Sequence, residues 1–161
     1  MIIFGIRGII QNLDDFLKKV TVLEKENKIT IQLFRADRIF GQEHLVSATE
    51  KAVRTWDAGR AMSRTLGMEI MLYAAAERQT SEAIRKIGIH EGISEMAVVI
   101  VGQVPENLLE SLGVEQDDSV LEPKGKDPAI FGITREEIET EGEARIPELV
   151  LEKIALSEVT R

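Results

Sequence analysis

The sequence predicts an α/β fold in which helix-rich layers pack on a small, mostly antiparallel mixed sheet. Three short runs have the composition of strands, at residues 2–6, 29–34 and 97–101, and apolar residues at helical spacing dominate between and after them. The two kinds of element alternate irregularly, which is typical of helices layered on a small sheet. With 161 residues, no repeat and no clear linker, the chain is expected to form one domain over residues 1–161.

The first part of the chain is expected to supply two strands and two helices. Residues 2–6 form a short apolar strand, and a cap at Asn12 or Asp14 begins a helix that runs to about residue 26. Residues 29–34, with the sequence ITIQLF, alternate apolar and polar side chains as a half-buried strand does. Helical periodicity returns over residues 43–56.

The most apolar helix is predicted at the centre of the chain, over residues 63–76. Apolar side chains surround almost its whole circumference, so it is expected to lie in the core. A second helix over residues 80–87 is expected to end at Gly88 in the left-handed conformation common at that position. The run AVVIV at residues 97–101 then predicts a buried strand.

The remaining elements are marked by local signals. Pro105 is suited to the first turn of a short helix, which ends near residue 112. Residues 113–128 indicate a strand followed by an exposed loop. Thr134 and Glu137 have the spacing of a capping box, and Pro147 begins the last helix.

Composition favours a soluble globular protein of the cytoplasm. Hydrophobic residues make up 43% of the chain and charged residues 30%, and cysteine is absent, so we expect neither disulfides nor thiolate chemistry. The apolar start is only about ten residues long and lacks the charged leader of a signal peptide. No apolar run reaches the roughly 20 residues that a membrane span requires, so no membrane association is expected.

Positive charge is concentrated in one part of an acidic chain. The net charge is −8, yet residues 51–90 hold seven basic and four acidic side chains, whereas residues 91–161 hold six basic and 17 acidic ones. Because local fields depend on where charges lie, a basic face on an acidic protein can still bind phosphate.

Catalytic and metal-binding signals are weak. His44 and His90 have no partner at metal-ligand spacing and are expected at the surface or its boundary, and no phosphate-binding glycine loop is present. Glu69 lies within the apolar helix, where a carboxylate must be paired or protonated, and Arg64 or Arg78 is expected to pair with it. A small-molecule enzyme centred on Glu69 remains an open alternative. We expect no enzyme activity, no cofactor and no metal.

A set of cationic and polar residues around the central helix is the main candidate site. If the helix extends back to Arg60, then Arg60 and Arg64 share one of its faces, while Arg78 and Gln79 lie in the turn after it and Lys86 in the next helix. The residues alone leave two roles open. The cations either bind phosphate groups or stabilise the carbonyl ends of helices.

The same central block resembles the small tRNA-binding and kinase-binding subunit of the KEOPS complex. The strands IIFGIRG and EMAVVIVG occur where members of that family have strands, and Thr80 stands where isoleucine is more usual. Glycine-rich residues are common in the family where this chain has Ala75, Ala76 and Glu77. The shared features are Leu66, Glu69-Ile70, Leu72-Tyr73, Arg78-Gln79, Glu82-Ala83-Ile84 and residues 86–89.

The resemblance implies a function and two partners. It implies a non-catalytic subunit of a complex that makes threonylcarbamoyl-adenosine in tRNA, and that holds tRNA by its single-stranded 3′ CCA end. On that basis the expected RNA-binding residues are Arg60, Arg64, Arg78, Gln79 and Lys86. The second implied partner is the kinase-like ATPase subunit of KEOPS, whose activity such subunits regulate. The alternative is a pure protein adaptor of that kinase-like subunit, without RNA binding of its own.

The last helix is the candidate surface for the kinase-like subunit. Leu149, Val150 and Ile154 lie along one side at helical spacing. Such a stripe usually packs on the protein's own core, whereas the resemblance implies a helix that binds the kinase-like partner, and the sequence leaves both readings open.

Overall fold

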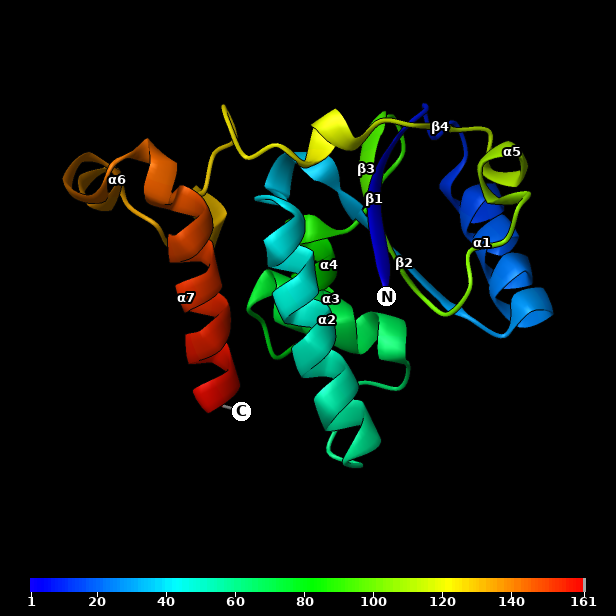
Figure 1. The fold of residues 1–161 in the computed structure, drawn as a ribbon, viewed down its shortest axis with the longest axis horizontal. Coiled ribbons are helices and arrows are strands. Elements are labelled where there is room, and N and C mark those ends of the chain that lie inside the picture. Colours follow the sequence, from blue (N-terminus) through cyan, green and yellow to red (C-terminus); the bar gives the residue numbers. More distant parts are fainter. Residues whose placement is uncertain (161) are drawn as a thin grey trace.

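A four-stranded antiparallel sheet forms the centre of the molecule in the computed structural model, which describes residues 1–160 (Figure 1). Its strands are β1 (Ile2–Arg7), β2 (Thr30–Arg35), β3 (Glu95–Val101) and β4 (Glu115–Gln116), in the order β2-β3-β1-β4. The predicted α/β fold is confirmed, and every strand pair within residues 1–160 is antiparallel. Arg161, the last residue of the predicted domain, lies outside the described residues.

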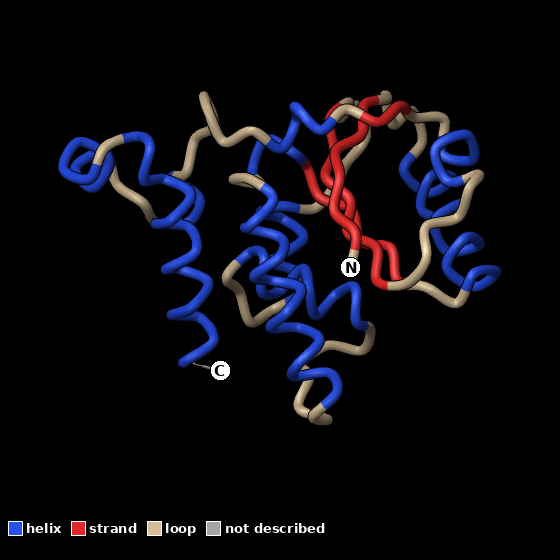
Figure 2. The backbone as a smooth tube through the Cα atoms, viewed as in Figure 1, coloured by secondary structure: helices blue, strands red, loops and turns tan. Residues whose placement is uncertain are grey.

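Helices cover both faces of the sheet (Figures 1 and 2). On one face lie α1 and α5, on the other lie α2, α3 and α4, and α7 packs outside α2 and α3. Among residues 1–160, no helix has the length and apolar character needed to cross a membrane. The helices are α1 (Leu13–Asn27), α2 (Gln42–Asp57), α3 (Leu66–Ala75), α4 (Thr80–Ile87), α5 (Leu108–Leu112), α6 (Arg135–Glu141) and α7 (Ile146–Val159).

The central strand β3 shows why its sequence is continuously apolar. Met96, Val98 and Ile100 face α1, and Ala97 and Val99 face α3, and all five are fully buried. Successive side chains of a strand point to opposite faces, so a strand covered on both faces needs apolar residues at every position. Two separate core clusters result, one on each side of the sheet.

The predicted core helix is α3, and it is buried on almost every side. Gly67 and all residues from Glu69 to Ala75 are buried. The helix begins at Leu66 rather than at residue 63, because the Thr65 hydroxyl accepts the Met68 N–H at 3.1 Å and caps the first turn. Gly88 does not have the expected left-handed conformation, since its φ of −73° and ψ of 157° are extended.

Capping signals at the surface were predicted correctly. Asn12 caps α1 by accepting the Asp15 N–H at 3.0 Å. Thr134 and Glu137 form the predicted reciprocal capping box at the start of α6. Both caps depend on contacts within four residues, so they can be recognised from local sequence.

His44 is buried rather than at the surface, so that expectation was wrong, whereas His90 is exposed. The Nδ1 of His44 accepts the Phe40 N–H at 3.0 Å, and the Nε2 of His44 lies 2.8 Å from the Ala74 carbonyl. Because a carbonyl only accepts, Nε2 carries the proton and the ring is neutral. Burial lowers the pKa of His44 to about 4.

The buried neutral imidazole predicts a loss of stability in mild acid. The unfolded state takes up a proton at His44 near pH 6.5, and the folded state does so only near pH 4. The unfolded state therefore binds more protons between these values, and the free energy of unfolding should fall by about 2 kcal/mol from pH 7 to pH 5. Urea unfolding at both pH values measures this loss.

The matched controls are His44→Gln and His90→Gln. The first should remove most of this pH dependence and the second should leave it unchanged, because His90 is exposed. An equal pH dependence in His44→Gln would contradict the assignment.

Candidate nucleic-acid interface

The loop that carries Arg60 and Arg64 is held in place by hydrogen bonds to one buried carboxylate. Glu69, in the first turn of α3, is 1% exposed. Its Oε1 accepts the N–H groups of Met62 at 3.0 Å and Ser63 at 3.1 Å, and the Ser63 hydroxyl at 3.0 Å. Its Oε2 accepts the Thr55 hydroxyl at 2.8 Å. These four bonds tie the end of α2 and the loop to α3.

The predicted ion pair of Glu69 with Arg64 or Arg78 was therefore wrong. Hydrogen bonds from backbone and hydroxyl groups satisfy the buried carboxylate in place of a cation. A carboxylate in the first turn also interacts favourably with the positive end of the helix dipole. The arginines are consequently left to face solvent.

Arg60 and Arg64 are both exposed, and neither forms an ion pair with any residue in the described range 1–160. They do not share a helical face as expected, because α2 ends at Asp57 and α3 begins only at Leu66. The two side chains instead project from one irregular loop whose backbone Glu69 fixes.

Arg78 and Gln79 lie at the other end of α3, in the turn that leads to α4. Ala76 ends α3 in the left-handed conformation, with φ of 54° and ψ of 45°, and the Glu77 N–H donates to the Leu72 carbonyl at 2.9 Å. The next two residues are exposed, and Gln79 occupies the N-cap position of α4 without a side-chain cap bond. Among residues 1–160, Arg78 has no ion-pair partner within 4 Å.

Lys86 has a structural position and does not join the exposed cations. Its side chain is buried, and its ammonium donates to the Ala75 carbonyl at 3.0 Å and to Glu77 at 2.9 Å. The ammonium also lies 5.5 Å from the centre of the Phe131 ring. Lys86 thus caps the carbonyl end of α3, the alternative role considered for this set of cations. We leave Lys86 out of the interface proposed below.

The predicted cationic site is divided between the two ends of α3. Arg60 and Arg64 precede its first turn, and Arg78 and Gln79 follow its last. A helix of ten residues is about 15 Å long. A ligand that contacts both groups must therefore extend along the molecule.

Two further cations near the second end were not found from the sequence. Arg38 donates to the Lys86 carbonyl at 2.6 Å, and burial together with the nearby Arg35 and Arg85 lowers its pKa. Lys126 donates to the carbonyls of Ile39 at 2.7 Å and Val120 at 2.6 Å, and burial lowers its pKa to about 8. Both contacts join segments far apart in the chain, so no local pattern indicates them.

The apolar stripe of the last helix belongs to the core. Leu149 is 5% exposed, Val150 and Ile154 are fully buried, and all three belong to the core cluster that includes α2 and α3. These residues cannot form the surface for the kinase-like subunit, so that prediction is corrected. The large exposed apolar side chains of α7 are instead Leu156 and Val159, which are 60% and 83% exposed.

Comparison with known proteins decides the family. The family described as kinase binding protein CGI-121 matches residues 9–158. The chain belongs to the CGI-121 family. The regulatory protein Cgi121 of Methanocaldococcus jannaschii is 30% identical over 164 residues, an alignment that covers 100% of this chain and 99% of that protein. The resemblance noted from the central block is thereby confirmed.

A second CGI-121 relative is eukaryotic. The EKC/KEOPS complex subunit CGI121 of Coccidioides immitis is 28% identical over 85 residues, which cover 53% of this chain and 41% of that protein. The likeness to this relative is therefore partial, whereas the archaeal match spans nearly the whole of both proteins.

In this CGI-121 chain, Glu69 is expected to control the order of the arginine loop. Glu69→Leu removes the carboxylate that accepts the part-buried Met62 and Ser63 N–H groups, and should lower the free energy of unfolding by about 3 kcal/mol. Amide exchange across residues 58–65 should also become faster, because their anchor is lost. Urea unfolding and hydrogen exchange measure the two effects.

Glu69→Gln is the matched control. It keeps one carbonyl oxygen for the Met62 and Ser63 donors, while the Thr55 hydroxyl can turn to accept, so its effect should be much smaller. Equal losses in both variants would show that charge, and not the acceptor geometry, holds the loop.

Proposed function

We propose that this chain is a non-catalytic, regulatory subunit of a KEOPS-type complex that recruits tRNA by its 3′ CCA end and binds the kinase-like ATPase subunit. The observation that carries the proposal is the family match over residues 9–158. It is supported by the printed names of the relatives, one a regulatory protein and the other a subunit of an EKC/KEOPS complex.

The exposed arginines support the RNA-binding part of the proposal. Arg60, Arg64 and Arg78 are exposed and have no carboxylate partner among residues 1–160, so they can neutralise phosphates without breaking an existing ion pair. Their separation by α3 favours an extended single strand over a compact anion. The acidic remainder of the chain, which gives a net charge of −8, repels RNA elsewhere.

The kinase-binding part rests on the family and on the outer side of α7. Leu156 and Val159 are exposed apolar side chains near the end of that helix. Buried apolar side chains near the centre of an interface contribute much of its binding energy. We therefore place the kinase-like subunit against the outer side of α7, in place of the buried stripe.

The RNA-binding proposal predicts end-specific, salt-sensitive affinity. Purified chain should bind tRNA that carries the 3′ CCA and lose that binding when the CCA is removed. Arg64→Glu and Arg78→Glu should each weaken binding about tenfold, because each removes a charge-assisted contact. Each should also reduce the slope of log affinity against log salt by about 0.7. Fluorescence anisotropy across a salt series measures both quantities.

Lys19→Glu is the control for charge, since Lys19 is exposed on helix α1, which packs on the opposite face of the sheet from α3. It should leave the affinity and the slope almost unchanged. Equal binding of tRNA with and without the CCA, or none, would favour the alternative function of a pure adaptor for the kinase-like subunit.

The kinase-binding proposal predicts a loss of complex formation on α7. Leu156→Glu should weaken binding to the kinase-like subunit about tenfold, because a charge replaces an apolar contact. Val22→Glu on α1 is the control, as Val22 is 50% exposed and lies on the opposite side of the sheet. Size-exclusion chromatography and calorimetry measure the complex. Unchanged binding by Leu156→Glu would move the interface away from α7, and no binding by the unmodified chain would overturn this part of the proposal.

A further inference from the structure

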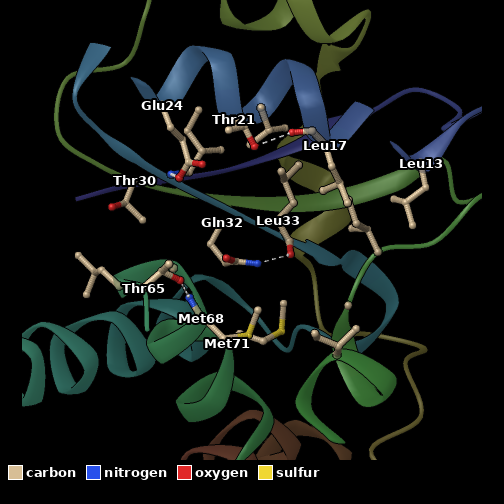
Figure 3. Close-up of a pocket in the computed structure, with 17 residues that line it drawn as sticks. Leu13, Leu17, Thr21, Glu24, Thr30, Gln32, Leu33, Thr65, Met68 and Met71 are labelled. Atoms are coloured by element: carbon tan, nitrogen blue, oxygen red, sulfur yellow. Dashed lines mark hydrogen bonds between the residues drawn. The ribbon is translucent and has the colours of Figure 1, made fainter. Parts of the chain in front are cut away.

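An apolar groove runs beside strand β2, between α1 and α3 (Figure 3). Its volume is about 420 Å³. Leu17 and Glu24 of α1 lie on one side of the strand, and Met68 and Met71 of α3 lie on the other. Ile84 of α4 also lines the groove, and its side chain is 47% exposed.

The strand that borders this groove is an edge strand. In the order β2-β3-β1-β4, β2 pairs with β3 on one side only. In an antiparallel pair, alternate residues direct both their N–H and C=O groups away from the partner strand. The Ile31 N–H bonds to Glu24 and not to β3. The backbone N–H and C=O groups of Ile31 and Leu33 are therefore the ones that face the groove.

Two side chains occupy places that a further strand would fill. Glu24 Oε2 accepts the Ile31 N–H at 3.0 Å, as the carbonyl of a neighbouring strand does. Gln32 Nε2 donates to the Leu33 carbonyl at 3.3 Å, as the amide of a neighbouring strand does. By the same alternation the Leu33 N–H and the Ile31 carbonyl also face the groove, and no side chain of residues 1–160 bonds to either.

The groove has one ionisable side chain on mostly apolar walls. Of the described residues that line it, Glu24 alone has an ionisable side chain. The carboxylate is half-buried, and its pKa is raised by that burial, with the Ile31 N–H acting in the opposite direction. A carboxylate with this degree of burial and no cation beside it is complementary to a basic group on an occupant.

We propose that the β2 groove binds an extended peptide segment of a partner protein, which adds a fifth, outer strand to the sheet and places a lysine or arginine against Glu24. Peptides bind exposed sheet edges through main-chain hydrogen bonds, while pockets beside the strand select their side chains. Apolar side chains predominate on both walls of this groove, so the peptide is expected to have apolar residues on both of its faces. The six residues of β2 match a segment of about 20 Å.

This inference goes beyond the proposed RNA-binding and kinase-binding roles. It uses none of the exposed arginines and no residue of α7. The groove is bounded by α1, β2, α3 and α4, whereas α7 packs on α2 and α3 from outside. Failure of the peptide test therefore leaves those roles untouched, and their failure leaves the groove untouched.

A library of end-blocked, fluorescein-labelled seven-residue peptides tests the proposal. Four positions are varied among Val, Ile, Leu and Phe, the central position is Lys, Gln or Glu, and the ends are Ser. The Lys pool should bind most tightly and the Glu pool least. N-methylation of alternate backbone amides in the best binder should weaken it at least tenfold, because it removes the ladder bonds. In ¹⁵N spectra of the full chain, exchange of the Leu33 amide should slow on binding.

Matched variants locate the site. Leu17→Glu and Ile84→Glu alter side chains that are 41% and 47% exposed and line the groove, so the fold should survive and peptide affinity should fall at least tenfold. Val22→Glu changes a residue of α1 that is 50% exposed and lies outside the groove, and should have no effect. Glu24→Gln still accepts the Ile31 N–H and should abolish the preference for Lys over Gln.

Four outcomes would overturn the proposal. They are the absence of any pool with a dissociation constant below about 1 mM, binding that survives Leu17→Glu, and binding that survives N-methylation. The fourth is occupation of the groove by a different ligand, seen as perturbation of Leu33 by a CCA oligonucleotide or as self-association that Leu17→Glu abolishes.

Discussion

The burial of α3 is the constraint on which the rest of the structure depends, because an apolar helix enclosed by protein must still satisfy the polar groups at its two ends. At the first turn the Thr65 hydroxyl accepts the Met68 N–H while Glu69 binds the loop before the helix, and at the last turn Lys86 binds the Ala75 carbonyl. An anion therefore lies at the positive end of the helix dipole and a cation at the negative end. Each of these buried charges also fixes the segment that carries the exposed arginines.

The same constraint explains why the exposed cations form two groups. Once Glu69 is satisfied by hydrogen bonds and Glu77 by Lys86, no buried carboxylate near α3 needs Arg60, Arg64 or Arg78. The left-handed turn at Ala76 then directs the chain away from the helix. One stretch of sequence thus carries both exposed cations and a structural one, and the burial of Lys86 distinguishes its role from that of the exposed arginines.

Local signals predicted the elements, and contacts between distant segments decided the site. The caps at Asn12 and Thr134 and the apolar character of α3 follow from neighbours within a few residues, so they could be predicted. The roles of Lys86 and the stripe around Val150 depend on which other elements lie against them, and a helical repeat of apolar residues looks the same on a core face as on a partner face. His44 was misplaced for the same reason, since its partner Ala74 is 30 residues away. The family resemblance needed neither kind of contact, because it depends on a block of residues that is recognisable in the chain itself.

The edge strand β2 is a further case in which the sequence pattern does not reveal contacts with other segments. ITIQLF alternates as a half-buried strand does, and nothing in that pattern indicates that Glu24 and Gln32 bond to its outer backbone groups. Proteins protect exposed edges in order to avoid uncontrolled strand pairing, and side-chain partners give such protection while remaining displaceable. A Glu24 carboxylate that has lost part of its hydration but has no cation beside it is a poor permanent cap, because burial without a counter-charge disfavours the ionised form. A basic residue on an added strand would supply the counter-charge that Glu24 lacks, and the backbone of that strand would supply the ladder bonds that β2 lacks on this edge. The edge of β2 is therefore better suited to pairing with a peptide than to being capped by Glu24 and Gln32.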